Sequence, residues 1–246
     1  MAEDLLTLFD ETAVAIRDAV APLRGADRRG RTDRPGQYAL DLVADKAALE
    51  VLHRVPATIV SEESGITGAK SAPITIVIDP IDGSSNAVRD IPYWATSLCA
   101  LDREGPLAAL VINHATGVSF RALRGKGATR DGEPLVPSTR TRVEDAVVGI
   151  SNFPGRMLPW KQFRALGSCA LALCDVAYGA LDGYFDTGSV HAPWDYLGGL
   201  LVCTEAGVNI VDADDRDLAL ADPSAKRKIV AAGTPQLLQS LRTAVG

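Results

Sequence analysis

Two segments within the first 55 residues repeat their apolar positions with the period of an amphipathic helix. Apolar side chains recur at steps of three and four residues, which places them on one helical face. This pattern predicts a helix over residues 5–23 and a second over residues 38–55. Between them, residues 26–37 are rich in Arg, Asp, Gly and Pro and predict a mobile loop. The second helix carries Asp41 and Asp45, which we expect on the protein surface.

A continuous apolar run, Ile74-Thr75-Ile76-Val77-Ile78, predicts a strand that is buried on both faces. Pro80 removes a backbone donor and should end this strand, so that Asp79 lies at its carboxyl end. Gly83 permits a tight turn, and one of residues 84–86 (Ser-Ser-Asn) can cap a helix. Taken alone, these residue types are typical of any strand-to-helix loop, so a functional interpretation depends on partners elsewhere in the chain.

The rest of the chain changes from mainly antiparallel strands to alternating helices and strands. Short apolar segments between turn residues predict an antiparallel meander over residues 95–122 and a hairpin at Asp131-Gly132. Further strands are expected over residues 58–60, 146–150, 183–186, 208–211 and 229–232, and further helices over residues 168–180, 194–206 and 235–245. This order predicts an α+β subdomain at residues 1–140 and an α/β subdomain at residues 141–246.

Composition and charge narrow the class of protein. The 246 residues are 47% hydrophobic, which is enough for a large core. The formal net charge of −6 argues against a nucleic acid polymer as a partner, because the chain lacks the positive field that would attract one. No stretch of about 18 apolar residues and no signal-like N-terminus occur, which predicts a soluble cytoplasmic protein without a membrane partner. Four cysteines lie in apolar segments without zinc spacing and are expected to be buried thiols: Cys99, Cys169, Cys174 and Cys203.

Carboxylates follow two of the predicted strands and begin a late helix. Glu62 follows the strand at residues 58–60, and Asp79 and Asp82 follow the apolar run. Asp195 stands in the first turn of the helix predicted over residues 194–206, where an acid suits the helix dipole. Carboxylates beside a helix N-terminus suggest a metal and a phosphate bound together.

The segment before Asp195 reads His191-Ala192-Pro193-Trp194. Pro193 is placed where a helix starts. His191 has no paired Ser or Cys nucleophile motif, so we expect a structural residue or one at the rim of the substrate site.

Three segments together resemble the inositol monophosphatase family. They are residues 61–64 (Ser-Glu-Glu-Ser), residues 79–86 (Asp-Pro-Ile-Asp-Gly-Ser-Ser-Asn), and Trp194-Asp195 with Glu205-Ala206-Gly207 behind it. The resemblance covers most of the chain. It implies the layered α-β-α-β-α sandwich of inositol monophosphatases and fructose-1,6-bisphosphatases. It also implies a magnesium-dependent, lithium-sensitive phosphatase that forms a homodimer.

The resemblance also implies the ligands of two Mg²⁺ ions. Glu62, Asp79 and the carbonyl of Ile81 would hold one ion. Asp79, Asp82 and Asp195 would hold the second, so that Asp79 bridges both. Ligand sets made only of oxygen suit magnesium, which shares its coordination sphere with substrate phosphate.

The remaining roles implied by the family concern the attacking water, the phosphate and the alcohol. Ser84 would orient the water with help from Glu62, and the N–H groups of Gly83 and Ser84 would receive phosphate oxygens. The alcohol of a small phosphorylated polyol or sugar would contact Asp82, Gly167, Ser168, Asp186 and Asp195.

The chain departs from the family pattern at several positions. Serines replace a threonine pair at Ser84 and Ser85, and Ala87 stands where an aromatic residue is common. The segment 41–45 is two residues shorter than usual. In the family this stretch supports a third, weakly held metal ion, for which Asp45 is the expected ligand here.

Alternatives remain open at the level of the sequence. Within the same fold, the substrate could be fructose 1,6-bisphosphate, histidinol phosphate or 3'-phosphoadenosine 5'-phosphate. A phosphatase with an aspartyl nucleophile would use a D-x-D motif, whereas this chain has D-x-x-D. A non-catalytic module that binds a metal and a phosphorylated metabolite is the alternative from another class.

Overall fold

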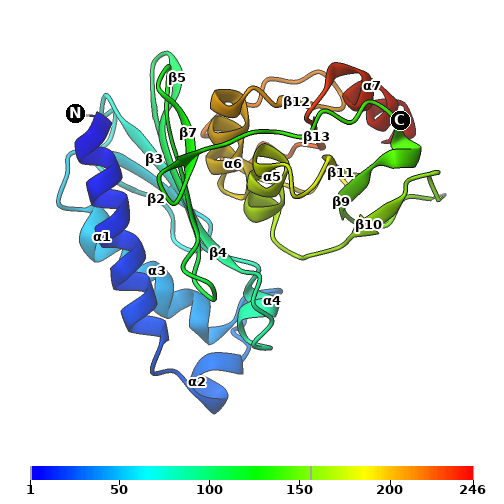
Figure 1. Cartoon of the computed structure of the whole chain (residues 1–246). Helices are drawn as coiled ribbons and strands as arrows, with labels where there is room; N and C mark the ends of the chain where they lie inside the picture. Colours follow the sequence, from blue (N-terminus) through cyan, green and yellow to red (C-terminus); the bar gives the residue numbers. More distant parts are fainter. Residues whose placement is uncertain (1, 156, 246) are drawn as a thin grey trace.

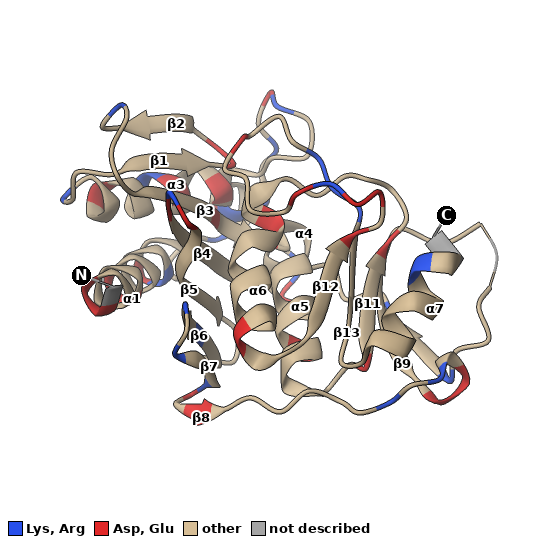
Figure 2. Ribbon diagram, turned by 90° about the horizontal axis from the view of Figure 1, so that it is seen from above, with Lys and Arg blue, Asp and Glu red and all other residues tan. Residues whose placement is uncertain are grey.

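A computed structural model describes residues 2–155 and 157–245 of the chain, arranged in five layers. Helices α1 and α3 cover one face of a large sheet, helices α5 and α6 fill the space between the large sheet and a smaller one, and α7 covers the outer face of the smaller sheet (Figure 1). The α-β-α-β-α sandwich expected from the sequence is therefore confirmed. Figure 2, seen from above, shows α5 and α6 between the two sheets.

The first layer is built from α1 (Ala2–Val20) and α3 (Ala39–Leu52), with the short α2 (Gly25–Arg29) between them. The apolar positions of α1 face inward, since Phe9 and Ile16 are fully buried. Both long helices match the expected amphipathic segments. Helix α2 lies in the segment predicted as a loop, where its five residues are too few for a periodic signal.

The large sheet has the strand order β2-β1-β3-β4-β5-β6-β7-β8. Its strands are β1 (Thr58–Ser61), β2 (Gly65–Gly68), β3 (Thr75–Asp82), β4 (Ala95–Asp102), β5 (Gly105–Asn113), β6 (Ser119–Leu123), β7 (Gly127–Arg130) and β8 (Glu133–Pro134). All neighbours pair antiparallel except β1 and β3, which are parallel. The predicted meander and the hairpin at Asp131-Gly132 are confirmed.

Strand β3 runs two residues beyond Pro80, and the prediction that Pro80 ends it was wrong. The register of β3 against β4 shifts between Asp79 and Asp82, and this irregularity accommodates a residue that cannot donate to the ladder. The carbonyl of Pro80 accepts a hydrogen bond from Thr96 Oγ1 at 2.8 Å. The strand thereby carries both aspartates on one buried segment. Helix α4 (Ser84–Ala87) follows at once, with Gly83 as its N-cap.

The smaller sheet has the order β10-β9-β11-β13-β12. Its strands are β9 (Val147–Ser151), β10 (Gln162–Arg164), β11 (Gly183–Asp186), β12 (Asn209–Asp212) and β13 (Ile229–Ala232), and the accompanying helices are α5 (Cys169–Tyr178), α6 (Pro193–Ala206) and α7 (Pro235–Val245). A 3-10 turn at Val143–Asp145 precedes β9. The chain crosses between the sheets after Pro134, and the division into subdomains at residue 140 stays a prediction.

The four cysteines are buried and unpaired, as predicted. No helix in the described part of the chain combines the length and apolar character needed to span a membrane.

Candidate active site

Neighbouring parallel strands bring the first two acids together. Strand β1 pairs with β3 so that Ser61 lies beside Ile78, and the N–H of Glu62 donates to the carbonyl of Ile78 at 3.2 Å. Glu62 and Asp79 therefore follow adjacent strand positions at the same edge of the sheet. Their carboxyl groups are close enough to interact, and the charge of Glu62 raises the pKa of Asp79.

The orientation of the aspartates on β3 is fixed by local hydrogen bonds. Asp79 Oδ1 accepts from the N–H of Ile81 at 2.9 Å. Asp82 Oδ2 accepts from Ser168 Oγ at 2.6 Å and from the N–H of Ala170 at 2.8 Å, at the start of α5. The N-terminus of α5 thus holds one oxygen of Asp82 and leaves the other toward the neighbouring acids.

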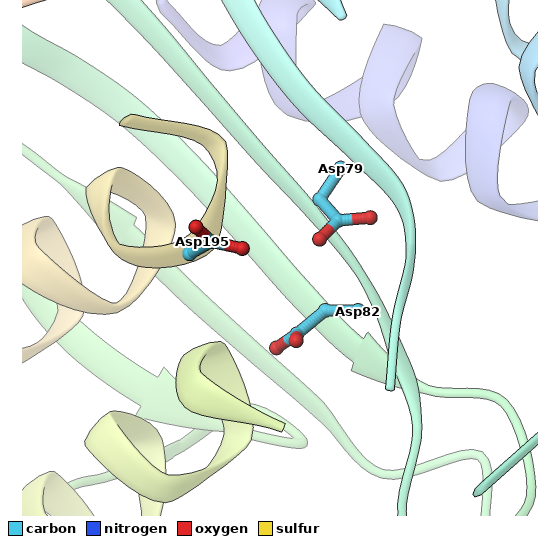
Figure 3. A group of neighbouring side chains, drawn as sticks. All are labelled: Asp79, Asp82 and Asp195. Atoms are coloured by element: carbon cyan, nitrogen blue, oxygen red, sulfur yellow. The ribbon is translucent and has the colours of Figure 1, made fainter. Parts of the chain in front are cut away.

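Asp195 enters from the opposite side, in the first turn of α6. Pro193 occupies the first turn, and Asp195 Oδ2 accepts from the N–H of Ala192 at 2.6 Å in a capping interaction. Figure 3 shows Asp195 on its helix facing Asp79 and Asp82 on their strand. Asp195 lies more than 110 residues after the two aspartates of β3 in the sequence.

Among the described residues, these three acids form a group that could hold a metal ion. Each offers a carboxylate oxygen, and the three oxygens lie within 4.8 Å of one another. Glu62 is outside this group but interacts electrostatically with all three acids. Donors that are exclusively carboxylate oxygens fit a hard divalent cation such as Mg²⁺ rather than a thiophilic metal.

Without a cation, these carboxylates oppose one another's ionisation. Burial, followed by the charges of Asp195 and Glu63, raises the pKa of Glu62 to about 8. Burial, followed by the charge of Asp195, raises the pKa of Asp82 to about 6, although its hydrogen bonds act in the opposite direction. Burial and the charge of Glu62 raise the pKa of Asp79 well above its usual range. A bound cation would relieve this repulsion, so the group is arranged for a positive charge.

The turn after β3 presents the groups expected to contact phosphate. Gly83 has a φ of 94°, which turns the chain sharply from strand into helix. None of the turn and loop hydrogen bonds between described residues uses the N–H of Gly83 or Ser84. Ser84 Oγ donates to the carbonyl of Ile81 at 3.0 Å, the carbonyl assigned to the first metal ion by resemblance.

The prediction that Asp41 and Asp45 lie on the surface was wrong, since both are buried. Asp41 faces Ser84, and Asp41, Ser84, Glu62 and Arg34 help to line one cavity of about 110 Å³. Burial raises the pKa of Asp41, and its Oδ1 is buried without a hydrogen-bond partner. The helical periodicity of the sequence could not predict the burial of Asp41, because that burial depends on the loop that packs over the helix.

Asp45 lies apart from the group of three aspartates. Its Oδ1 accepts from Ser61 Oγ at 2.5 Å, with Ser64 Oγ at 3.4 Å. Two serine hydroxyls therefore already contact the carboxylate predicted to bind a third metal ion, and that site stays a prediction.

The residues predicted to contact the alcohol separate into two groups. Ser168 caps α5 and binds Asp82, and Gly167 lies at the exposed start of that turn. Asp186 is fully buried, and Asp186 Oδ1 accepts from Asn152 Nδ2 at 2.8 Å and from the N–H of Gly188 at 2.9 Å. In this arrangement the buried carboxylate of Asp186 organises the loop after β11. Its contact with the substrate stays a prediction.

Comparison with known proteins bears directly on this arrangement. The model of the inositol monophosphatase family matches residues 11–245. The chain belongs to the inositol monophosphatase family. A fructose-1,6-bisphosphatase/inositol-1-monophosphatase from Archaeoglobus fulgidus is 33% identical over 258 residues, which cover 97% of this chain and 98% of the relative.

Two further comparisons are with a relative that has a different name and with a solved structure that has the same fold. The Nus factor SuhB from Pasteurella multocida is 33% identical over 195 residues and covers 70% of each chain. The structure of a hypothetical protein from Pyrococcus horikoshii with similarities to inositol-1 monophosphatase superposes with a TM-score of 0.89, at 24% identity and full coverage of both chains. The family is one of phosphatases, and the names of its members differ in substrate.

Proposed function

We propose that the protein is a magnesium-dependent phosphatase that hydrolyses a small phosphate monoester, most simply inositol monophosphate or a related sugar phosphate. The observation that carries the proposal is the convergence of Asp79, Asp82 and Asp195, with Glu62 beside them, at a turn where the N–H groups of Gly83 and Ser84 have no hydrogen-bond partner among the described residues. Carboxylates that repel one another in a buried site are costly unless a cation occupies it. A phosphatase site uses that cation, and the turn then receives the phosphate.

Two magnesium ions, when bound, would supply an activated water and stabilise the departing oxygen of the alcohol. The chain's own contribution is to position these partners. Asp79, Glu62 and the Ile81 carbonyl would hold one ion, and Asp79, Asp82 and Asp195 the other. The N–H groups of Gly83 and Ser84 would orient the phosphate.

Hydrogen counting at Ser84 connects Asp41 to this mechanism. A serine hydroxyl has one hydrogen, and here it is donated to the carbonyl of Ile81. If Ser84 donated to the unpartnered Oδ1 of Asp41 instead, the Ile81 carbonyl would be free for a cation. The oxygen of Ser84 could then accept a hydrogen bond from the attacking water and hold that water in line with the phosphate.

A substrate with a second phosphate is the other candidate, and one observation favours it. Three arginines, Arg29, Arg31 and Arg89, line a cavity of about 560 Å³ together with Tyr38. The hydroxyl of Tyr38 lies 3.3 Å from Ser85 Oγ, next to the phosphate turn. Arg29 pairs with Asp90, whereas none of the ion pairs between described residues involves Arg89. A bisphosphate such as fructose 1,6-bisphosphate could place its second anion there.

The variant Asp82→Asn distinguishes a phosphatase from a non-catalytic binding module. An amide keeps the size and the hydrogen bonds of the side chain but removes a charge from the metal group. We expect turnover of inositol monophosphate to fall by at least about 100-fold, since metal-ion activation is lost. A binding module would show no turnover in the wild-type protein and could keep its ligand affinity in the variant.

Lithium inhibition and a homodimeric assembly are implied by the family resemblance and stay predictions, as does the cytoplasmic location.

A further inference from the structure

His191 lies between the smaller sheet and the metal group, by which we mean the acids Asp79, Asp82 and Asp195. It is nearly buried, with 9% of its surface exposed. Its backbone pairs with Arg227, whose N–H donates to the carbonyl of His191 at 2.8 Å. The segment that leads into α6 is therefore anchored to the chain just before β13.

The imidazole is also held by its side-chain neighbours. His191 Nε2 lies 2.8 Å from the hydroxyl of Tyr184 on β11, and that hydroxyl donates to Ser151 Oγ on β9 at 2.7 Å. The thiol of Cys169, the first residue of α5, interacts with the ring as well. Ring, hydroxyls and thiol form a buried polar chain with little freedom to rotate.

Counting the hydrogens in this polar chain shows that Nε2 of the ring carries a hydrogen. The hydroxyl of Tyr184 has one hydrogen, and Ser151 receives it, so the N–H on Nε2 must be the donor to Tyr184. The opposite ring nitrogen, Nδ1, then faces Asp195, 3.8 Å from Oδ2. That same oxygen accepts the N–H of Ala192.

Oδ2 of Asp195 is thus held on the protein side. It accepts a hydrogen bond from a backbone N–H and lies 3.8 Å from a ring that its neighbours hold in place. The other oxygen is left for Asp79 and Asp82 across the site (Figure 3). We propose that His191 is a positioning residue, which fixes the rotation of the Asp195 carboxylate and so sets the affinity of the second cation. The inference rests on the proposed function in that it assumes a cation at this group.

The experiment measures Mg²⁺ binding directly, by isothermal titration calorimetry without substrate, in the full-length protein and its variants. His191→Ala removes the ring, and Tyr184→Phe removes only the hydroxyl that orients it. Tyr93→Phe is the matched control, because the hydroxyl of Tyr93 is also partly buried and donates at 2.6 Å, but to Asp175, which is not one of the proposed metal ligands. Thermal unfolding of each variant shows whether it is folded.

We expect His191→Ala to weaken Mg²⁺ binding by about 10-fold or more, as losses of groups that orient metal ligands do. Tyr184→Phe should weaken it in the same direction but less, and Tyr93→Phe should leave it unchanged. Where turnover is measured, the magnesium concentration for half-maximal rate should rise while KM for the ester at saturating magnesium stays the same. A residue that only fills space would lower the unfolding temperature without this selective shift.

Wild-type affinity for Mg²⁺ in a folded His191→Ala protein would overturn the inference. If that variant does not fold, unchanged affinity in Tyr184→Phe would overturn it instead. Because binding is measured without substrate, a wild-type protein that binds magnesium but hydrolyses no ester would refute the proposed function alone. A wild-type protein that binds no magnesium would refute both.

Discussion

Ser84 is the residue at which strand, helix and metal group meet. Its hydroxyl contacts the Ile81 carbonyl, and the buried Asp41 faces it. In Ser84→Ala the attacking water would lose its positioning hydroxyl, and we expect kcat to fall by about 100-fold, within the range for loss of a group that handles a proton in the transition state.

Ser84→Thr is the control, since threonine keeps the hydroxyl and is the residue usual at this position in the family. It should retain most of the activity, with the same magnesium dependence. Steady-state kinetics of both variants on one ester would decide. Equal loss in the two variants would show that packing, not the hydroxyl, matters at this position.

Most of the acids in the site could be predicted as individual residues, and their neighbours could not. Glu62, Asp82 and Asp195 stand at the end of a strand or the start of a helix, and Asp79 directly follows the apolar run inside β3. Asp41 could not be assigned, because its burial depends on packing against the turn at Ser84. The contact of His191 with Tyr184 likewise depends on tertiary packing.

At the scale of elements, the connection from β3 to α4 depends on Gly83. Its φ of 94° lies in the left-handed region, and a Cβ atom added there would come within 3.0 Å of the Gly167 carbonyl and 3.2 Å of the Tyr93 carbonyl. We therefore expect Gly83→Ala to lower the free energy of unfolding by roughly 1–3 kcal/mol, from backbone strain and crowding. Urea unfolding measures this change.

Gly117→Ala is a suitable control for this effect. Gly117 also has a positive φ, of 78°, but a Cβ atom there would meet nothing within 4 Å. The control should lose less stability and keep full activity. Gly83→Ala should also lose activity, because a shift of the backbone would move the N–H that we propose binds the phosphate. Equal loss of stability in the two variants would mean that crowding at Gly83 contributes nothing.

The long helices and most of the strands were predictable, whereas some of the short elements were not. Helices α1, α3, α6 and α7 and the strands of the meander carry enough residues for a periodic pattern. Helix α2 and strands β2 and β10 have five residues or fewer, and the partly or fully exposed residues of β10 have no apolar pattern to detect. The run of β3 past Pro80 was missed because the register shift that permits it forms only against β4.

At the scale of the molecule, the metal group links stability to pH. In the metal-free protein the pKa values of Glu62 and Asp82 are raised to about 8 and about 6, above values of about 4.3 and about 3.9 in an unfolded chain. The folded state therefore binds more protons than the unfolded state over this interval. Its stabilisation is complete below pH of about 4 and is lost as pH rises through about 6 and then about 8.

Magnesium should reverse this trend, because its ligands must be deprotonated and its affinity rises with pH. We expect the unfolding temperature in a chelator to fall between pH of about 5 and about 9, while the increase produced by saturating magnesium grows over the same range. Scanning calorimetry at a series of pH values provides the test. A magnesium-induced increase that shrinks with rising pH would argue against carboxylates as the ligands.

The layer arrangement of the whole molecule was implied by the resemblance to the inositol monophosphatase family. The order of elements by itself predicted only a mainly antiparallel α+β part followed by an α/β part. The contact of α6 with both sheets explains why Asp195 reaches the acids of β3. The arginines beside Tyr38, which we propose as a site for a second phosphate, come together only in the folded chain, so the sequence alone could not suggest this choice of ester.

The most direct test of the central claim is phosphate release from inositol 1-phosphate and fructose 1,6-bisphosphate, measured with magnesium, with a chelator, and after magnesium is restored. The account predicts release from at least one ester with magnesium, its abolition by the chelator, and its return with the metal. A folded protein that binds magnesium yet releases no phosphate from either ester or from other small monoesters, or that releases it equally well in the chelator, would contradict the account.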